Sequence, residues 1–252
     1  MKTRLIEKFR DANSPETCSD NLKRLALDDD PIVRASVIHN ANKPVSTVEI
    51  LYNDKSELVQ EALKMQSYPS PLQIIKSESV TGKTIILRDA DISDAQFIVQ
   101  LRNDAKKSRF ISATSQDIDA QVSWLHKYKE SNDQVYFIIT DKSGKRYGTV
   151  RIYDQKGDSF CWGSWILSDE APKHFAIESS LIVYKYALKI GFKNAHFSVT
   201  KGNDSVIKFH QRFGAKLVSE SDEELFFSIS ENEILNSISK YSKYLPDEIK
   251  IN

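Results

Sequence analysis

The segment from Ile166 to Ala215 constrains the fold of this chain most, because it reads as strand end, polar loop, amphipathic helix, strand and short helix in that order. Residues 159–167 are aromatic and apolar, as expected for a buried strand. A helix then begins near Phe175 and carries an apolar stripe at helical spacing, formed by Ile177, Leu181, Tyr184 and Leu188. Gly191 stands where a helix ends with positive φ. Free backbone N–H groups at the helix start face the polar loop, which favours a diphosphate site there.

The second half of this segment adds a strand and another helix. Residues 195–200 alternate apolar and polar side chains, the period of a strand with two different faces. Gly202 and Asn203 interrupt the pattern, and a short helix follows that ends at Gly214. Its inner stripe consists of Val206, Phe209 and Phe213. His210 lies one turn beyond the first of these, so we expect it beside an apolar seam.

This order of elements resembles the GCN5-related N-acetyltransferase (GNAT) superfamily over roughly residues 83–230. In that superfamily a strand ending V-x-P leads to a loop R/Q-x-x-G-x-G/A, and the next helix often begins G-Y-A-T-E-A. Ala176 and Glu178 match the helix start, whereas Ala171 and His174 replace the basic or amide residue and the first glycine of the loop. The resemblance implies an acetyl-CoA site formed by Ile166, Leu167, Ser168, His174, Phe175, Ala176, Ile177 and Glu178.

The short helix carries a second GNAT pattern, N-x-x-A/S-x-x-L-Y-x-x-x-G-F, with its spacing intact. The pattern maps onto Asn203, Val206, Phe209, His210, Gly214 and Ala215. The resemblance implies that Asn203 and Lys208 contribute to the cofactor site, and that His210 replaces the Tyr that protonates the departing CoA thiolate. An imidazole of pKa about 6.5 can exchange a proton with a thiol of pKa about 8.5. The residues alone leave plainer roles open, namely packing for His210, a turn for Asn203 and a contact with the helix dipole for Glu178.

Residues 101–128, LRNDAKKSRFISATSQDIDAQVSWLHKY, suggest how an acceptor is bound. The motif LRN, the arginine that follows it and the spacing Q-x-x-W resemble the nucleotide-amino-sugar acetyltransferases, including those of pseudaminic-acid synthesis. The resemblance implies a substrate site formed by Arg102, Asn103, Arg109, Trp124 and Trp165. The arginines would pair with a substrate diphosphate, and an indole would form an apolar wall for a sugar or base. The plainer roles are solvated arginines, a tryptophan packed in the core and a helix-capping asparagine.

Charge and length exclude several classes of function. The 35 basic and 35 acidic side chains cancel, so no overall field favours nucleic acid or a membrane as partner. The 252 residues contain no apolar run long enough to span a bilayer and no signal core, so we expect a cytoplasmic protein. Cys18 and Cys161 lie far apart, which favours reduced thiols, and neither belongs to a metal-binding signature.

The chain is expected to divide into an all-α segment at residues 1–75 and a larger domain at residues 76–252. LALDDDPIVRASV from Leu25 resembles LYNDKSELVQEAL from Leu51, which indicates a degenerate HEAT-like or leucine-rich-variant helical repeat. The residues expected to face inward are Ile32 and Val33 in one unit and Leu58 and Val59 in the other. Such a segment would serve docking, either in a homodimer or with a protein partner.

The larger domain is predicted to have an α+β fold, a central mixed and mostly antiparallel sheet flanked by helices. The polar run KSESVTGK is predicted to be a linker, since Pro69 and Pro71 disfavour helix before it. Helices are expected at residues 92–104 and 116–130, and a polar helix is expected at the C-terminus. Strands are expected at residues 84–88, 134–140, 146–153, 159–167, 195–200 and 225–230.

An enzyme of this kind would hold acetyl-CoA and an amine side by side for direct attack on the thioester. Proximity of two reactants can supply about 7 to 11 kcal/mol. No general base is evident, because Asp158, Asp169 and Glu170 only flank the strand at residues 159–167. The favoured hypothesis is acetylation of a dTDP- or UDP-linked amino sugar for surface polysaccharide. The alternatives are a protein N-terminal or small-amine acetyltransferase, and a non-catalytic interaction protein on a decayed GNAT fold.

Overall fold

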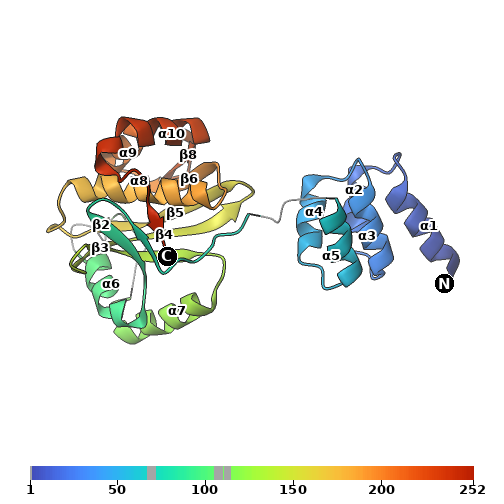
Figure 1. The fold of residues 1–252 in the computed structure, drawn as a ribbon, viewed down its shortest axis with the longest axis horizontal. Helices are drawn as coiled ribbons and strands as arrows, with labels where there is room; N and C mark the ends of the chain where they lie inside the picture. The colour runs from blue at the N-terminus through green and yellow to red at the C-terminus, as the bar shows by residue number, and fades with distance from the viewer. Residues whose placement is uncertain (1, 67–71, 105–109, 111–114) are drawn as a thin grey trace. The chain divides into compact units, whose positions relative to one another are not determined.

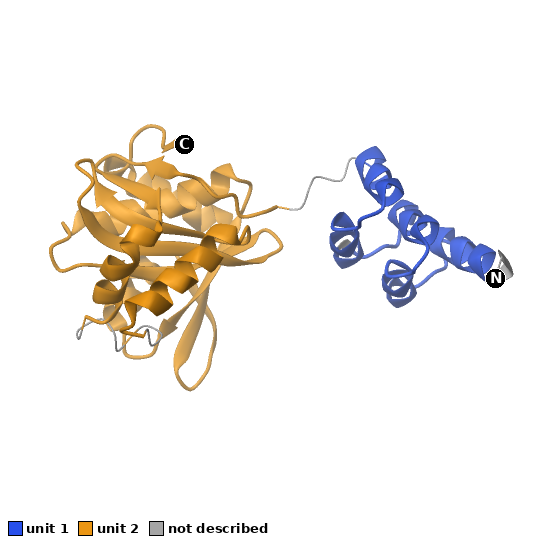
Figure 2. Ribbon diagram, turned by 90° about the horizontal axis from the view of Figure 1, so that it is seen from below, with its two compact units in different colours: residues 1–71 blue, residues 72–252 orange. Residues whose placement is uncertain are grey.

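The computed structural model describes residues 2–66, 72–104, 110 and 115–252 of the chain. The chain divides into two compact units, residues 1–71 and 72–252, which Figure 2 draws in separate colours. This division lies a few residues before the expected one between residues 75 and 76. Within the described part of the chain, no helix has both the length and the apolar character required to cross a bilayer.

The first unit is made of the short helices α1 (Lys2–Asn13), α2 (Ser19–Leu25), α3 (Pro31–His39), α4 (Val45–Tyr52) and α5 (Glu57–Met65). The repeat seen in the sequence corresponds to α3 and α5. Val33 and Val59 occupy equivalent positions and are fully buried. Ile32 and Leu58 are 46% and 45% exposed, so the prediction that they too face inward was wrong. Successive helical residues point about 100° apart, and in these short helices only one of each pair reaches the core.

A matching pair of turns joins the two repeats. The carboxylate of Asp28 accepts a hydrogen bond from the backbone N–H of Asp30 (3.1 Å), and that of Asp54 accepts one from Ser56 (2.8 Å). Arg34 bridges the turns, because it donates to the carboxylate of Asp54 (2.6 Å) and to the carbonyl of Asp28 (2.6 Å). The hydrogen bond from Arg34 lowers the pKa of Asp54. Polar turn contacts therefore hold the repeat together alongside its apolar core.

The second unit is built on a nine-stranded sheet with the order β7-β8-β6-β5-β4-β3-β2-β1-β9. Its strands are β1 (Ser79–Thr81), β2 (Ile85–Asp89), β3 (Val135–Asp141), β4 (Arg146–Lys156), β5 (Ser159–Leu167), β6 (Asn194–Thr200), β7 (Lys216–Glu220), β8 (Glu224–Ile229) and β9 (Lys250–Ile251). The pairing of β5 with β6 is parallel, and the other strand pairs are antiparallel. The sheet is therefore mixed and mostly antiparallel, as predicted.

Helices cover both faces of this sheet. In Figure 1, α6 and α7 lie below it, and α8, α9 and α10 lie above it. Their bounds are α6 (Ala95–Arg102), α7 (Ile118–Glu130), α8 (His174–Lys189), α9 (Asp204–Arg212) and α10 (Glu231–Lys240), with 3-10 turns η1 (Ile92–Asp94) and η3 (Ser242–Tyr244). The predicted helices and strands are thus all present, with ends shifted by a few residues.

Alternation along the central strands sorts side chains into two cores. Phe137 of β3 belongs to the large core beside α8, whereas its neighbours Tyr136 and Ile138 belong to the smaller core beside α6 and α7. Arg151 of β4 pairs directly with Tyr136, and cross-strand neighbours point to the same face of a sheet. The face covered by α6 and α7 therefore carries an arginine among aromatic residues.

Two short strands, one at an edge of the sheet and one beside the other edge, were not predicted from the sequence. The run KSESVTGK, predicted to be a linker, contains β1, which pairs with β2 and with the C-terminal β9. Strand β7 was not predicted either, and every one of its residues is exposed. Short strands at or beside the edge of a sheet lack the apolar alternation that identifies a strand from sequence, because their stability comes from backbone pairing.

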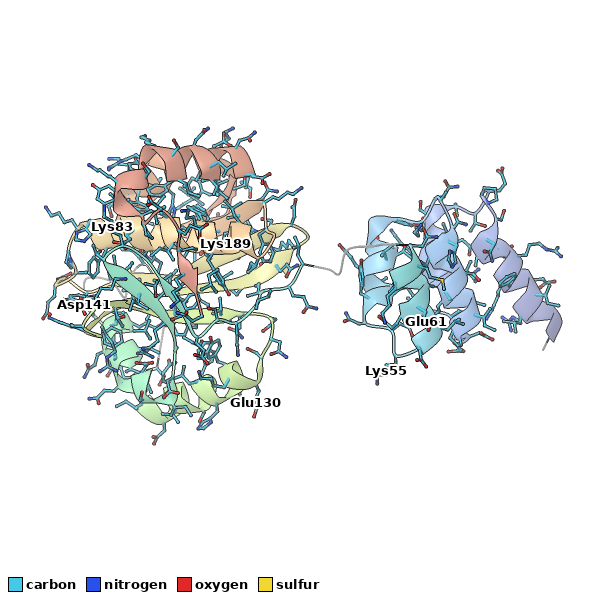
Figure 3. All side chains as sticks on the ribbon, viewed as in Figure 1. Lys55, Glu61, Lys83, Glu130, Asp141 and Lys189 are labelled. Atoms are coloured by element: carbon cyan, nitrogen blue, oxygen red, sulfur yellow. The ribbon has the colours of Figure 1, made fainter. Side chains whose placement is uncertain are left out.

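The C-terminal segment is fastened to the second unit by lysines that donate to backbone carbonyls. Lys83 donates to the carbonyl of Lys243 (2.8 Å), and Lys189 approaches that of Ile249 (3.5 Å). Figure 3 labels Lys83 and Lys189 near opposite ends of α8. Ser237 of α10 also donates to the carbonyl of Phe213 (2.8 Å). The polar C-terminal helix therefore packs over α8 and α9 as part of the domain.

Candidate active site

Strands β5 and β6 separate in the middle of the sheet. Their parallel pairing covers only residues 159–161 of β5 and residues 194–196 of β6. Beyond it, the two strands and α9 line a cavity of about 270 Å³. We call this the β5–β6 cavity, and its lining includes Tyr153, Trp162, Trp165, Phe197, Asn203, Val206 and His210.

Three aromatic rings in mutual contact fill the point where the strands part. The ring centre of His210 lies 4.2 Å from that of Phe197 and 5.2 Å from that of Trp162. The rings of Trp162 and Phe197 are 5.8 Å apart. A side chain of α9 is therefore inserted between the diverging strands, and the separation of β5 from β6 is filled by close aromatic packing.

Burial changes the acid–base chemistry of His210. Its removal from water lowers its pKa from an ordinary 6.5 to about 3. Its Nδ1 atom has no hydrogen-bond partner among the residues that the structure describes. At neutral pH the ring is therefore neutral, and the imidazolium needed to give a proton to a thiolate is scarcely populated. The position of His210 beside an apolar seam agrees with the sequence, whereas this pKa disfavours the role that the resemblance implied.

Strand β5 contains an irregularity at the inner end of the cavity. Its register with β4 shifts between Thr149 and Arg151. Ser164 has a φ of 47°, in the left-handed region that non-glycine residues seldom adopt. Its carbonyl accepts a hydrogen bond from the hydroxyl of Thr149 (2.7 Å), which holds this conformation in place. The irregularity places Ser164 on the boundary between two cavities.

The second cavity, of about 340 Å³, lies on the side of α6 and α7. We call it the α6–α7 cavity, and its lining includes Arg102, Asp117, Ala120, Trp124, Tyr136, Arg151 and Ser164. Both cavities include Ser164 and Arg102 in their linings, so they meet at these residues. Two reactants held one in each cavity would therefore come together beside the bulge of β5.

Aromatic rings surround the guanidinium of Arg151 in the α6–α7 cavity. Its central carbon lies 5.3 Å from the ring centre of Trp124 and 4.6 Å from that of Tyr153. Burial lowers the pKa of Arg151, although an arginine remains charged at any working pH. Arg102 adds a second positive charge and is hydrogen-bonded to Tyr136. Among the described residues of the lining, the acid is Asp117, which caps α7 by accepting from the N–H of Asp119 (2.9 Å).

The predicted diphosphate-binding residues lie at the start of α8, which begins at His174. The ring Nε2 of His174 is 3.1 Å from the hydroxyl of Thr84. Glu178 is fully buried and accepts hydrogen bonds from the N–H groups of Thr84 (2.7 Å) and Ile85 (3.2 Å). Glu178 thus connects α8 to β2. Gly82 leaves room for this contact, since a Cβ at that position would lie 2.7 Å from the carboxylate of Glu178.

Other residues predicted for the cofactor site have mixed surroundings. Ile166 is buried and Leu167 packs against the large core, as do Phe175 and Ile177. The N–H of Ser168 donates to the carbonyl of Tyr147 (2.7 Å), and the carbonyl of Ala176 accepts from the hydroxyl of Ser180 (2.9 Å). Asn203 precedes α9 and lines the β5–β6 cavity, whereas Lys208 is exposed on α9 and outside that lining.

The residues predicted for the substrate site are divided between the two cavities. Arg102 and Trp124 line the α6–α7 cavity. Trp165 lies instead in the β5–β6 cavity, where its ring is 4.9 Å from that of Phe209. Asn103 follows α6, and its amide donates to the carbonyl of Val99 (2.9 Å), the capping contact that was the plainer alternative. Arg109 lies outside the described residues.

Sequence reasoning missed Arg151, Tyr153 and Ser164. The period-two pattern of β4 contained a usable signal, because Arg151 and Tyr153 alternate with the buried Val150 and Ile152 and so share the opposite face of the strand. Burial raises the pKa of Tyr153, so its phenol stays protonated throughout the neutral range. The shift in register that creates the bulge leaves no comparable mark in the sequence.

Comparison with known proteins agrees with this geometry. Residues 84–216 match the family described as Acetyltransferase (GNAT) domain, a range that holds nearly all of both cavity linings. The chain belongs to the GNAT family of acetyltransferases. This membership confirms the resemblance and the fold predicted from the sequence, and it identifies the protein as an acetyl-transferring enzyme.

Several solved GNAT structures share this fold. FdhC in its apo form, described as a nucleotide-linked sugar GNAT, is 37% identical with a TM-score of 0.61, and the match covers 67% of this chain and 98% of that one. A GCN5-related N-acetyltransferase from Brucella melitensis is 16% identical with a TM-score of 0.60, covering 72% and 91%. A chimera of the spermidine N-acetyltransferase SpeG from Vibrio cholerae is 15% identical with a TM-score of 0.54, covering 61% and 99%. The last two show the fold alone, and comparison with curated protein sequences gives no match.

Membership of the GNAT family implies acetyl-CoA as the acyl donor. Whether the residues present fit acetyl-CoA can be judged from the β5–β6 cavity, whose lining includes an apolar aromatic wall and the amide of Asn203. An apolar wall suits the acetyl thioester and the hydrocarbon parts of a pantetheine chain, and an amide side chain suits the polar groups of that chain. This GNAT enzyme therefore has a cavity of suitable chemistry where β5 and β6 part.

Proposed function

We propose that this enzyme transfers the acetyl group of acetyl-CoA to the amine of a dTDP- or UDP-linked amino sugar, a reaction of surface polysaccharide biosynthesis. The observation that carries the proposal is the meeting of two cavities of different chemistry at Ser164. The 37% identity to FdhC, described as a nucleotide-linked sugar GNAT, supports the same acceptor class.

The charge of the α6–α7 cavity supports an anionic acceptor. Its lining includes Arg102 and Arg151, and the carboxylate of Asp117 is engaged at the start of α7. Trp124 adds a broad apolar surface of the kind on which a sugar or base can lie. A polyamine or another polycation would meet two like charges in this cavity, whereas the diphosphate of a nucleotide sugar would meet two complementary ones.

The donor would lie in the β5–β6 cavity with its thioester near Ser164. Asn203, which lines this cavity, would hydrogen-bond the pantetheine arm. The diphosphate of CoA would lie at the start of α8, near His174, where backbone N–H groups and the helix dipole favour an anion. The predicted site residues Ser168, Ala176 and Lys208 would border the same ligand.

Direct attack of the neutral amine would form the new C–N bond and break the C–S bond of the thioester. The nitrogen must lose a proton, and the CoA thiolate must gain one. With a pKa of about 3, His210 supplies a neutral ring beside the thioester rather than an acidic proton. We therefore assign proton delivery to the phenol of Tyr153, which lines the same cavity, and the phenolate left behind would take up the proton that the attacking nitrogen loses.

Purified protein incubated with acetyl-CoA and a panel of amines tests the proposal. The panel contains a dTDP-amino sugar, a UDP-amino sugar, the same sugars without nucleotide, spermidine and a peptide with a free N-terminus. Mass spectrometry should find an acetyl group added to a nucleotide-linked sugar, with the free sugar at least tenfold slower. Preferred acetylation of the peptide or spermidine would instead establish the small-amine alternative.

A further inference from the structure

The α6–α7 cavity contains a positive charge without an ionic partner. Arg151 forms no ion pair or hydrogen bond with a carboxylate anywhere in the part of the chain that the structure describes. Its Nε atom is buried and has no hydrogen-bond partner among these residues. A buried donor that carries charge and lacks an acceptor is costly, and an arginine does not escape that cost by losing its proton.

A comparison with Arg146 on the same strand shows that this arrangement is specific to Arg151. Arg146 lies 3.3 Å from the buried carboxylate of Asp94, which also pairs with Arg88 at 2.9 Å. Strand β4 thus has two arginines near α6 and α7: Arg146 is paired with a carboxylate, whereas Arg151 is attracted by Asp133 only from beyond ion-pair distance among the described residues. The difference points to a ligand as the counterion of Arg151.

The aromatic neighbours of Arg151 define how such a ligand can approach. The guanidinium carbon lies 5.3 Å from the ring centre of Trp124 and 4.6 Å from that of Tyr153. Contacts with ring faces stabilise the cation and restrict its orientation, while its N–H groups point outward in the guanidinium plane. A planar fork held in this way is suited to two oxygens of one phosphate.

We infer that Arg151 binds a phosphate group of the acceptor in the α6–α7 cavity and thereby selects diphosphate-bearing amines. The inference rests on the proposed function, and it adds a specificity-determining residue that sequence patterns did not identify. Arg102 lines the same cavity and supplies a second charge for the diphosphate. The amine of the same acceptor then points toward Ser164, where the cavities meet.

Calorimetric titration of the full chain with dTDP, UDP and inorganic pyrophosphate tests the inference, with thymidine as the uncharged comparison. The wild-type protein should bind dTDP at least tenfold more tightly than thymidine. Arg151→Gln should weaken dTDP binding by about 30-fold. Arg151→Lys keeps the charge but loses the planar fork, so its dTDP affinity should lie between those of the wild type and Arg151→Gln. Arg146→Gln is the matched control on β4 and should leave dTDP affinity unchanged.

Two further measurements separate misfolding from loss of the site. Acetyl-CoA affinity and the thermal midpoint should be the same in Arg151→Gln and in the wild type, because Arg151 lines the acceptor cavity alone. Equal dTDP affinity in wild type and Arg151→Gln would overturn the inference, as would a wild-type protein that binds neither nucleotide nor pyrophosphate.

The same variants distinguish this inference from the proposed function. Arg151-dependent binding of dTDP without acetylation of any nucleotide sugar would uphold the inference and refute the proposed acceptor. Acetylation of a nucleotide sugar with the same KM in Arg151→Gln and wild type would uphold the function and refute the role of Arg151. A rise in acceptor KM larger than any fall in kcat is the expected result, because Arg151 binds the phosphate and also lies 4.6 Å from the ring of Tyr153.

Discussion

The two cavities that meet at Ser164 differ in how their walls are made. The β5–β6 cavity has a cluster of aromatic rings in its wall, formed by Trp162, Trp165, Phe197 and His210, and the imidazole of His210 is held neutral by burial. The α6–α7 cavity also has aromatic walls, but they surround Arg151, which keeps its charge. Burial therefore keeps His210 uncharged in the β5–β6 cavity, whereas Arg151 keeps its charge in the α6–α7 cavity without an ion-pair partner among the described residues.

This difference suits two kinds of reactant. A neutral ring and apolar walls favour a thioester, whose carbonyl reacts most readily where water is excluded. An arginine without a partner favours an acceptor that brings its own negative charge. The irregularity of β5 near Ser164 separates the two environments and also joins them, since Ser164 belongs to both linings. Variants that affect one cavity, the other or both should therefore be separable by experiment.

The largest effect is expected from Gly148→Ala, which should damage both cavities together. A Cβ at Gly148 would lie 2.2 Å from the carbonyl oxygen of Ile166, which forces β4 away from β5 beside the bulge. We expect a loss of about 3 kcal/mol or more in the free energy of unfolding, measured in urea. Gly157→Asn is the control, since its φ of 59° suits asparagine and nothing lies within 4 Å of its Cβ position.

The next largest effect is expected from Val206→Trp, which should fill the β5–β6 cavity alone. Val206 is half-buried on α9 and lines that cavity. The indole should weaken acetyl-CoA binding by about 100-fold, or about 2.7 kcal/mol, and leave dTDP binding intact. Calorimetry with each ligand measures the two effects separately. Gln211→Trp, on an exposed part of the same helix, should change neither binding affinity. Equal weakening of acetyl-CoA and dTDP binding in Val206→Trp would show that the cavities are not independent.

His210 should make the protein sensitive to acid. Its pKa is about 3 in the folded state and about 6.5 in the unfolded chain, so unfolding takes up a proton between these values. The stability that the neutral ring of His210 contributes to the fold is fully present above pH 6.5 and is lost as the pH falls. Between pH 7 and pH 5, the unfolding free energy of the wild type should drop by about 2 kcal/mol more than that of His210→Phe. Replacement of the exposed His126 by Asn should not alter this dependence.

The smallest effect is expected from Ala120→Trp, which should restrict the α6–α7 cavity. Ala120 is exposed on α7 and lines the rim of that cavity, so a larger side chain should be accommodated without loss of stability. The acceptor KM should rise by about tenfold, equivalent to about 1.4 kcal/mol, with acetyl-CoA affinity unchanged. Steady-state kinetics with the acetylated sugar as product provides the measurement. Lys127→Trp, also exposed on α7 but outside the lining, is the control.

The same contrast explains how much the sequence could predict. The β5–β6 cavity is made largely from one continuous segment, and its helix and strand periods fix the positions of Trp162, Asn203 and His210. The bounds of β5 could be predicted for the same reason, because its apolar run is long and ends in a polar loop.

The α6–α7 cavity could be predicted only in part, because separate elements bring its residues together. Arg102 and Trp124 were found through a local motif, but the pairing of Arg151 with Tyr136 depends on the register of β3 with β4. The low pKa of His210 could not be predicted from the sequence either, since it comes from the burial of the ring among side chains of β5, β6 and α9. Spacing along the chain gives a residue's position but not its exposure to water.

The most direct test of the two-cavity account is the initial-velocity pattern with acetyl-CoA and a nucleotide-linked amino sugar varied together. If both substrates occupy their cavities at once and the amine attacks the thioester beside Ser164, double-reciprocal plots should intersect. Parallel lines would indicate an acetylated enzyme formed before the acceptor binds, and they would contradict simultaneous occupation of the two cavities.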